Sequence, residues 1–574
     1  MKKKQIITLL VAMSITAGSV SGCGVSVKSS ECATNEPASV QSFCETATCD
    51  EPEYEEAPCE EADYVEEVPE YEEAPATCEE ACEDIYNDSD EYDSYESATN
   101  TKQLRAANKE SGEGSYLDEI YGTNKDYTDT NEEYSELEEI GFKTVRRSPL
   151  STFAADVDTA SYSNMRRMLM DGYSAYDLPE NSVRIEELIN YFDYDYKNPK
   201  GKEPFGVTTV LGDCPWNDRA KLLSIGLKTE DIDFADTPAS NLVFLIDVSG
   251  SMFSDDKLPL LQDAFCMLTN ELTSKDRVSI VTYAGSDSVV LKGAKGNENR
   301  KIKNAINDLE AGGSTNGSAG IETAYKLAEK YFIKGGNNRV ILATDGDLNV
   351  GITSVGGLED FISEKKESGV FLSVLGFGTG NIKDNRMETL ADKGNGNYAY
   401  IDSQREAKKV LVKELSSNML TVCKDVKFQV EFNPEAVKGY RLIGYSNRVM
   451  ANKDFNDDTK DGGEIGAGHT VTALYELVLR ENAEDKLLDL NIRFKRPSAD
   501  DSELLTYPVT LDSYEKYPGD DFLFQSAVAE FGLVASHSEY AEGANLDDAL
   551  YILESIDLND EYKEEFLDLV RYCR

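Results

Sequence analysis

The run Leu242-Val-Phe-Leu-Ile-Asp-Val-Ser-Gly-Ser251 joins five consecutive apolar residues to a short polar turn. An uninterrupted apolar run of this length is typical of a parallel strand that is covered on both faces. Asp247 ends the run, and the glycine and hydroxyl residues after it suit a tight turn. We therefore expect a buried strand whose carboxyl end presents oxygen atoms.

The residues around this run alternate between strand-like and helix-like patterns. Strands are predicted at 277–283, 288–291, 339–344, 370–376 and 397–401, and helices at 258–273, 300–309 and 318–332. Such alternation predicts a doubly wound, Rossmann-like α/β domain over residues 240–420. In sheets of this kind, ligands bind at the carboxyl ends of the strands, beside the point where the strand order reverses.

Three polar elements fall at those strand ends. Asp247, Ser249 and Ser251 follow the first strand, Thr315 lies in a glycine-rich loop before a helix, and Asp345 follows the strand at 339–344. All five residues offer hard oxygen ligands, which favours Mg²⁺ or Mn²⁺ over zinc. Each element alone is weak support, because Asp and Ser are common helix caps. A metal-free set of caps and turns is the alternative, and the occurrence of all three elements in order favours the metal.

The ligand set also indicates what the metal would do. Two carboxylates and three neutral hydroxyls leave a small octahedral dication with an open position and strong Lewis acidity. A carboxylate from another protein suits that position. The sequence therefore predicts a protein ligand that offers an Asp or Glu side chain.

These elements resemble the metal-ion-dependent adhesion site of von Willebrand factor type A (VWA) domains. The resemblance implies direct metal binding by Ser249, Ser251 and Thr315, and binding through water by Asp247 and Asp345. Longer runs are similar to YfbK-type bacterial lipoproteins, in which a VWA domain lies between family-specific N-terminal and C-terminal regions. Those runs are residues 151–162, 183–192, 342–351 and 466–476.

The first residues have the pattern of a lipoprotein signal peptide, predicted to span residues 1–22. A basic start at Lys2 to Lys4 and an apolar run at 6–18 lead into Val20-Ser-Gly-Cys23, which is similar to a bacterial lipobox. We expect Cys23 to carry the lipid; an ordinary secretory signal with a chance cysteine is the alternative. No other apolar run is long enough to span a bilayer, so lipid is the only membrane attachment expected. The predicted location is the extracytoplasmic face of the cell membrane, at the cell surface or in a periplasm.

Residues 23–147 are predicted to form a disordered acidic spacer. The chain carries a formal net charge of -51, and residues 31–101 contain no Lys or Arg. Low apolar content and like-charge repulsion oppose a packed core, and so much negative charge disfavours nucleic acid as a partner. Disulfides among the spacer cysteines, and metal binding by Cys78 and Cys82, both stay open. The spacer cysteines are Cys32, Cys44, Cys49, Cys59, Cys78 and Cys82.

The regions at 148–238 and 422–574 are predicted to form one host domain around the central one. Two strands, 205–212 and 221–229, precede the central domain, and an isolated hairpin is only marginally stable in water. The strands after it would expose unpaired edges. Joining both sets in a β-rich, sandwich-like domain solves both problems, and the metal edge is then expected to point away from the host. The later strands are predicted at 426–432, 440–445, 469–479, 487–494 and 504–509, and the closing helices at 522–536, 546–556 and 561–572.

No motif in the sequence indicates an enzyme. The chain lacks a nucleophile elbow, a phosphate-binding loop and an HExxH motif, and its two histidines, His469 and His537, fit structural positions. The acidic residues Asp255, Asp256 and Asp347 could serve a metal-activated water as general bases, but a solvated acidic rim explains them better. Three functions therefore stay open. They are metal-dependent protein binding, which we favour, envelope assembly with a structural metal, and metal-dependent hydrolysis.

One polar stretch in the C-terminal region has two further interpretations. Residues 452–468 contain four aspartates without the spacing of a known calcium loop. We expect a mobile acidic hairpin there, with a calcium site as the alternative.

Overall fold

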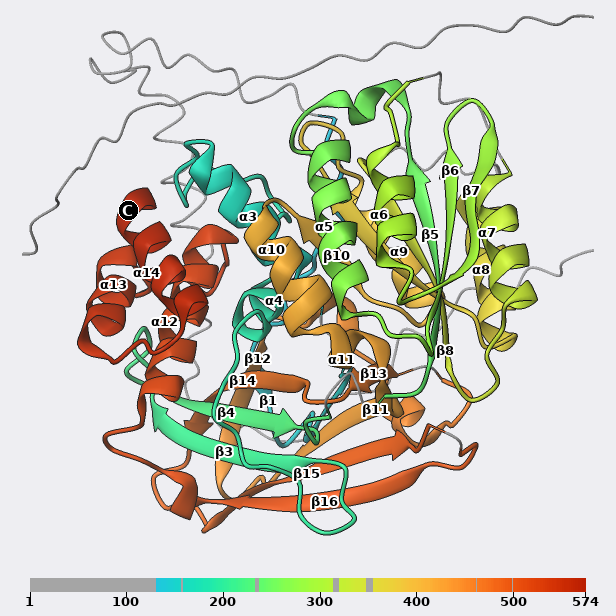
Figure 1. Ribbon diagram of the computed structural model, residues 1–574. Helices are drawn as coiled ribbons and strands as arrows, with labels where there is room; N and C mark the ends of the chain where they lie inside the picture. Colours follow the sequence, from blue (N-terminus) through green and yellow to red (C-terminus); the bar gives the residue numbers. More distant parts are fainter. Residues whose placement is uncertain are drawn as a thin grey trace, which may run out of the picture. The chain divides into compact units, whose positions relative to one another are not determined.

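Strand β5 (Ser240–Asp247) lies inside a six-stranded sheet with the order β10-β9-β8-β5-β6-β7 (Figure 1). All neighbours in this sheet are parallel except β7, which runs antiparallel to β6. The computed structural model describes residues 131–574, except 156–157, 233–236, 313–318, 347–354, 461 and 498. The other strands of the sheet are β6 (Arg277–Tyr283), β7 (Asp287–Lys295), β8 (Asn337–Thr344), β9 (Phe371–Phe377) and β10 (Tyr398–Ile401).

Helices cover both faces of this sheet. Leu242, Phe244 and Ile246 pack with the helices on one face, whereas Val243 and Leu245 pack with those on the other. The alternation follows from the period of two along a strand. The doubly wound architecture predicted for the central domain is confirmed. The first face carries α5 (Leu258–Glu271), α6 (Asn299–Asn307) and α10 (Gln404–Lys408), and the second carries α7 (Gly320–Lys330), α8 (Val355–Glu367) and α9 (Asp384–Lys393).

The regions before and after the central domain share two antiparallel sheets. One has the order β1-β12-β14-β4-β3, and the other has the order β13-β11-β15-β16, with β2 paired to β11. Phe432 of β11 stacks on Tyr440 of β12 at 4.1 Å between ring centroids, so the two sheets meet in one core. The strands are β1 (Lys143–Thr144), β2 (Leu150–Ala154), β3 (Gly206–Asp213), β4 (Lys221–Lys228), β11 (Thr421–Phe432), β12 (Val437–Ile443), β13 (Gly463–Gly466), β14 (Thr470–Leu479), β15 (Lys486–Lys495) and β16 (Glu503–Thr510).

The pairing of β4 with β14 confirms the predicted host domain. Ser224 lies opposite Leu474, so a strand before the central domain and a strand after it are neighbours in one sheet. The two connections to the central domain also lie together, because the Gly468 N–H donates to the Glu230 carbonyl (2.8 Å) and the Ala467 N–H to the Leu420 carbonyl (2.9 Å). The central domain is therefore inserted into the host at a single place.

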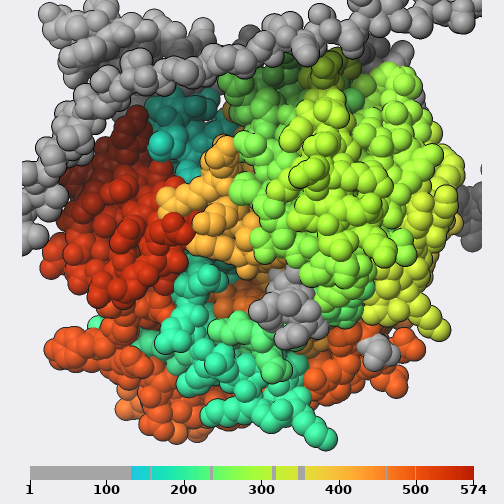
Figure 2. All heavy atoms as spheres, in the orientation of Figure 1, coloured from blue at the N-terminus to red at the C-terminus, as the bar shows by residue number. Residues whose placement is uncertain are grey.

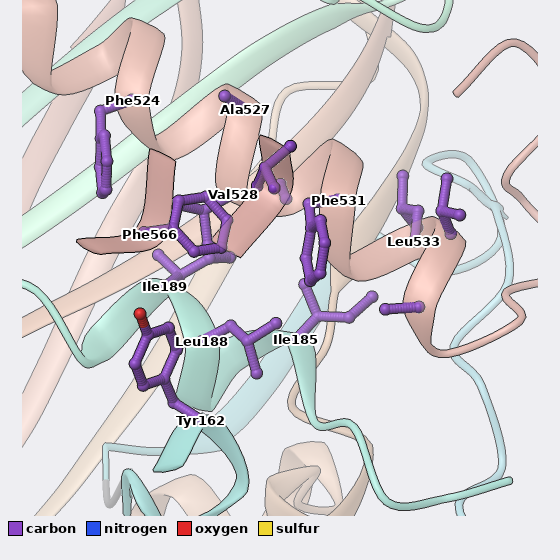
Figure 3. Close-up of a cluster of buried hydrophobic side chains, with 14 of the residues drawn as sticks. Tyr162, Ile185, Leu188, Ile189, Phe524, Ala527, Val528, Phe531, Leu533 and Phe566 are labelled. Carbon is purple, nitrogen blue, oxygen red and sulfur yellow. The ribbon is translucent and has the colours of Figure 1, made fainter. Parts of the chain in front are cut away.

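A layer of helices completes the host. The ring centroid of Phe566 in the last helix lies 5.3 Å from that of Phe531 and 6.3 Å from that of Tyr162, so the first and last helices of the host share one apolar core (Figure 3). This layer consists of α3 (Ala160–Met170), α4 (Ile185–Asn190), α12 (Asp520–Ala535), α13 (Leu546–Ser555) and α14 (Glu561–Cys573). The short elements are η2 (Gly250–Phe253), η3 (Lys409–Lys413), α11 (Leu415–Met419), η4 (Ser446–Arg448), η5 (Asn452–Asn456) and η6 (Leu511–Ser513).

The host also packs against the side of the central domain. The Ser163 hydroxyl of α3 donates to the Tyr400 carbonyl of β10 at 2.7 Å, so α3 covers the edge of the central sheet. The space-filling view shows the green and yellow atoms of the central domain in contact with the orange and teal atoms beside and below them (Figure 2).

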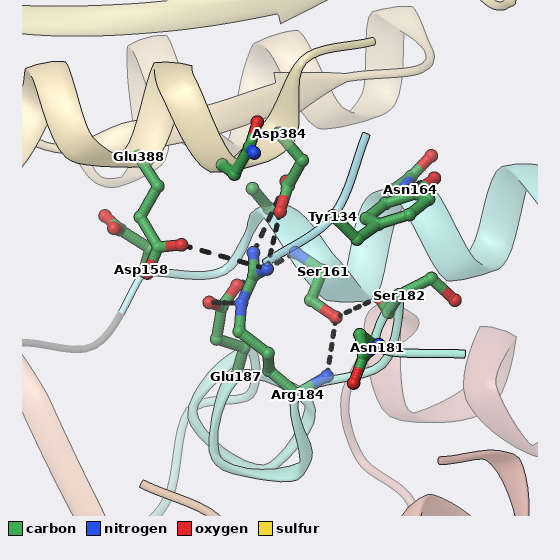
Figure 4. A network of polar contacts seen from close by, with 12 residues as sticks. Tyr134, Asp158, Ser161, Asn164, Asn181, Ser182, Arg184, Glu187, Asp384 and Glu388 are labelled. Atoms are coloured by element: carbon green, nitrogen blue, oxygen red, sulfur yellow. Dashed lines mark hydrogen bonds and ion pairs between the residues drawn. The ribbon is translucent and has the colours of Figure 1, made fainter. Parts of the chain in front are cut away.

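A buried ion-pair network joins the two domains near α9. Arg184, at the start of α4, lies 2.5 Å from Asp384 of α9 and 3.9 Å from Glu388, and it also pairs with Glu187 (Figure 4). Arg448 approaches Glu388 from the other side at 3.0 Å. Asp384 begins the helix that follows the carboxyl end of β9. The expectation that the metal edge points away from the host is therefore wrong at its β9 end, because charged host residues reach that edge.

Ordered structure differs from the sequence-based expectation at two further places. Residues 131–147, inside the range predicted as spacer, contact the central domain, where the Asn131 N–H donates to the Gly380 carbonyl at 3.2 Å. The acidic stretch at 452–468 holds η5 and β13, and β13 pairs with β11. A partner distant in sequence supplies these contacts, so local composition gave no sign of them. Cys23 and the six spacer cysteines lie outside the described residues.

Candidate metal site

The carboxyl ends of β5 and β8 bring two aspartates together. Ile246 of β5 lies opposite Ala343 of β8, so Asp247 and Asp345 leave the sheet at the same edge. The Thr344 hydroxyl approaches Asp247 Oδ2 at 3.4 Å and connects the two strand ends. Both carboxyl groups are buried. The parallel register therefore places two negative charges in one small region.

The turn after β5 adds two hydroxyl groups. The Ser249 backbone N–H donates to Asp247 Oδ1 at 2.8 Å, which is an aspartate turn of the usual kind. The Ser249 and Ser251 hydroxyl oxygens lie 2.9 Å apart. Ser249 is buried, whereas Ser251 is exposed. The two hydroxyl groups therefore lie between the buried carboxylates and the protein surface. Two oxygens at this separation can contact the same cation.

The two carboxyl oxygens of Asp345 differ in their hydrogen bonding. Its Oδ1 is buried and has no hydrogen-bond partner among the described residues, while its Oδ2 accepts from Lys257 Nζ at 2.9 Å. A buried oxygen left in this state costs about 1–3 kcal/mol, and more when it is charged. The orphaned oxygen, the second carboxylate and the two hydroxyls together fit a small dication with hard oxygen ligands.

The site holds two carboxyl groups and the single ammonium group of Lys257. Burial, with a smaller contribution from the negative charge of Asp345, raises the pKa of Asp247 to about 6. The hydrogen bond from Ser249 acts in the opposite direction. A divalent cation would favour the ionised form, because it supplies the opposite charge at close range.

The remaining predicted ligand lies outside the described residues. Thr315 belongs to residues 313–318, but the Gly312 N–H donates to the Val248 carbonyl at 2.8 Å. Gly312, three residues before Thr315, therefore lies beside the turn that holds Ser249 and Ser251. The structure therefore brings together Asp247, Ser249, Ser251 and Asp345, and Thr315 stays a predicted ligand.

Sequence reasoning missed the loop between β9 and α9. Gly378 has a φ of +74°, and an added Cβ would lie 2.3 Å from Cε of Lys257. An added Cβ at Gly346, directly after Asp345, would lie 2.0 Å from the Asn381 carbonyl oxygen. The loop thus packs against Lys257, which bonds Asp345, and against Gly346. Two glycines with positive φ, Gly378 and Gly380, were the only local signal.

The acidic residues proposed as a rim are only partly described. Asp255 is exposed, and Asp256 accepts a hydrogen bond from the neighbouring Ser254 hydroxyl. Asp347 lies outside the described residues. The positions of Asp255 and Asp256 agree with a solvated rim.

The two histidines lie elsewhere. A ring nitrogen of His537 lies 3.0 Å from the Leu178 carbonyl oxygen in the host. His469 lines a cavity of about 590 Å³ between the host and the central domain, together with Ile341, Lys409 and Tyr562. Burial lowers the pKa of His469 to about 4, which keeps the ring neutral near pH 7. None of the four candidate ligands in the described part of the chain lines this cavity.

The described residues contain neither a clustered metal site of the usual charged ligands nor a membrane-spanning helix. In residues 131–574, apart from the gaps given above, no three or more His, Cys, Asp or Glu side chains gather as a group that could hold a metal. Within the same part of the chain, no helix has the length and apolar character needed to cross a membrane.

Comparisons with known proteins divide the chain in the same way as the fold. The model of the von Willebrand factor type A domain matches residues 241–415. A model described as the C-terminal part of the uncharacterized protein YfbK matches residues 417–489 and 479–574, and one described as von Willebrand factor matches residues 128–224. Among solved structures, the von Willebrand factor type A protein from Catenulispora acidiphila is 14% identical with a TM-score of 0.38, covering 66% of this chain and 91% of that one.

Two curated relatives differ in how much of the chain they match. Inter-alpha-trypsin inhibitor heavy chain H4 from Homo sapiens is 27% identical over 150 residues, which is 25% of this chain and 16% of that protein. The uncharacterized protein YfbK from Escherichia coli K12 is 41% identical over 467 residues, which is 76% of this chain and 80% of that protein. The match to the second relative extends well beyond the central domain, and so this chain belongs to the YfbK family of proteins with a von Willebrand factor type A domain.

Proposed function

We propose that this protein binds a protein ligand through Mg²⁺ or Mn²⁺ held at the carboxyl ends of β5 and β8. The observation that carries the proposal is Asp345 Oδ1, which has no hydrogen-bond partner within the described residues, because a buried carboxylate oxygen beside a second carboxylate is suited to a cation. The proposed ligands are Asp247, Ser249, Ser251, Thr315 and Asp345. VWA domains in general serve protein interaction and adhesion, and they often bind a divalent metal.

The ligand of this metal would supply a carboxylate. The two serine hydroxyls are neutral, and Ser251 is exposed at the mouth of the site. A dication with few charged ligands keeps a strong attraction for an anionic oxygen. We infer that an Asp or Glu side chain of the partner completes the coordination.

Binding is a better supported proposal than hydrolysis. A hydrolytic metal site needs a general base close to the activated water. His537 contacts Leu178 and His469 lines a different cavity, while Asp255 is exposed and Asp256 bonds its own turn. These positions favour a protein that binds its partner without chemical change.

The decisive variant is Asp247→Ala. Bound metal stabilises the folded state by RT ln(1 + [L]/Kd), about 2.7 kcal/mol at a hundred-fold excess over Kd. We expect the melting temperature of the wild type to rise with Mn²⁺ and that of Asp247→Ala to stay constant. Asp231→Ala is the control, because the Asp231 side chain is 68% exposed, pairs with Lys228 at the surface (3.1 Å) and should respond to Mn²⁺ like the wild type.

The same variants test the partner. A pull-down from envelope extract should retain a protein in Mg²⁺ and lose it with a chelator or with Asp247→Ala. A partner that is retained in all conditions would contradict the proposal and favour an assembly role with a structural metal.

We also propose that Cys23 carries a lipid and holds the protein at the extracytoplasmic face of the membrane. The basic, apolar and lipobox-like parts of residues 1–23 support this. Cys23→Ser should abolish metabolic labelling with palmitate, and a labelled Cys23→Ser protein would refute the assignment.

A further inference from the structure

The ammonium group of Lys257 lies at the negative charge of the proposed metal site. Its Nζ is 2.9 Å from Asp345 Oδ2, in an ion pair whose side chains are 10% exposed for Lys257 and 0% for Asp345. Lysine is almost never buried unless it is paired. The contact between Lys257 and Asp345 is therefore a buried ion pair of the site and not an incidental surface pair.

Two separate elements hold this lysine in place. Lys257 precedes α5, and its backbone N–H donates to the Ser254 carbonyl at 3.0 Å. Its methylene stem passes over Gly378 in the loop after β9, where an added Cβ would lie 2.3 Å from Cε and 2.4 Å from Cγ. The glycine therefore leaves a groove for the stem, and the groove directs the ammonium group onto Asp345.

The two oxygens of Asp345 have different partners. Oδ2 contacts Lys257, whereas Oδ1 has no partner among the described residues. A metal ion, or a water bound to it, can approach Oδ1 without displacing the lysine. The ammonium group and the metal would then act on one carboxylate at the same time.

We propose that Lys257 is a built-in counter-cation that weakens divalent-metal binding and leaves the loaded site positively charged. This inference rests on the metal site of the proposed function. Two carboxylates and one dication are neutral together, so the ammonium group leaves one positive charge. A single carboxylate from the ligand balances that charge. Lys257 is thus a positioning residue that acts through Asp345. The metal-loaded site keeps its excess positive charge until the carboxylate of the ligand binds.

Removing the charge of Lys257 tests the proposal. Like charges a few ångströms apart in a partly buried site repel strongly enough to change affinity by about ten- to hundred-fold. We expect Lys257→Met and Lys257→Gln to bind Mn²⁺ more tightly by that factor, measured by electron paramagnetic resonance of free Mn²⁺. The glutamine amide can still donate to Asp345, so Lys257→Gln separates the charge from the hydrogen bond and covers the case in which Lys257→Met does not fold.

A second readout needs no metal. In a chelator, Lys257→Met should melt at a lower temperature than the wild type, because Asp345 loses its cation, and Mn²⁺ should restore more of the melting temperature than it does in the wild type. Lys563→Met is the matched control. Lys563 pairs with Asp521 at 2.8 Å and is 12% exposed, but it lies in the helix layer of the host. Its loss should leave Mn²⁺ affinity unchanged.

The possible outcomes distinguish this inference from the proposed function. If the wild type binds Mn²⁺ and both Lys257 variants bind it equally or more weakly, the inference is overturned and the metal site stands. If neither the wild type nor the variants bind Mn²⁺, the metal site and the inference both fail. Tighter binding in Lys257→Met and Lys257→Gln, but not in Lys563→Met, supports the inference.

Discussion

Glu530 is a carboxyl group buried in α12, and it makes stability depend on pH. Its Oε1 accepts the Asn545 N–H at 3.2 Å, and its Oε2 has no hydrogen-bond partner in the described part of the chain. Burial, with a smaller contribution from the charge of Asp548, raises the pKa of Glu530 to about 7. The unfolded carboxyl titrates near its usual value of 4.5. The folded state therefore loses stability as the pH rises from about 4.5 to about 7.

We expect Glu530→Gln to remove this loss. The variant should be more stable than the wild type at pH 8, by about 3 kcal/mol at most, and close to it at pH 5. Urea unfolding at the two pH values measures the difference. An equal difference at both pH values would show that packing, and not ionisation, separates the two proteins.

Single residues of the candidate site could be predicted only where their role is local. Asp247, Ser249 and Asp345 each follow a buried strand, so strand prediction alone brings them to one edge. Lys257 could not be identified, because its contact with Asp345 depends on a groove at Gly378. The sequence between those two positions contains no pattern that links them. The metal role of the predicted ligands stays a prediction.

At the scale of elements, a strand could be predicted when its own residues stabilise it, and not when it depends on its partner strands. Strands such as β5 and β8 are apolar enough to be recognised from their own residues. β1 has two residues, both exposed, and β13 holds two glycines, so only their partner strands stabilise them. Short strands of this kind have no signal in local composition.

The loop between β9 and α9 yields a prediction about one element. Gly378 and Gly380 both have positive φ, at +74° and +84°, but only Gly378 contacts the stem of Lys257. Each alanine substitution imposes a backbone cost of about 1–2 kcal/mol. Gly378→Ala should cost about 1–3 kcal/mol more than Gly380→Ala, because its Cβ must displace a buried side chain. Chemical unfolding of both variants tests this, and equal losses would mean that the groove is not required.

At the scale of the whole molecule, the sequence predicted that the central domain is inserted into the host. It did not predict the ion pairs between these two domains. Unpaired strand edges on both sides of the central domain required a shared sheet, and β4 and β14 form it. The contact between the domains depends on Arg184, Asp384 and Arg448, which are charged residues of a kind that is usually exposed. Sequence composition therefore assigns them to the surface, whereas the fold buries them together.

The Arg184 network should control whether the two domains unfold together (Figure 4). Arg184→Met leaves the buried carboxylates of Asp384 and Glu187 without this guanidinium, which costs about 3–5 kcal/mol. Because each domain has its own apolar core, we expect this cost to fall on the interface and to divide one calorimetric transition into two. Mn²⁺ should raise the transition temperature of the central domain only.

Arg386→Met is the control, since Arg386 is 44% exposed and pairs with Glu133 at 3.2 Å. Its loss should cost less than about 1 kcal/mol and keep a single transition. A single transition at the wild-type temperature for Arg184→Met would mean that apolar packing alone couples the domains.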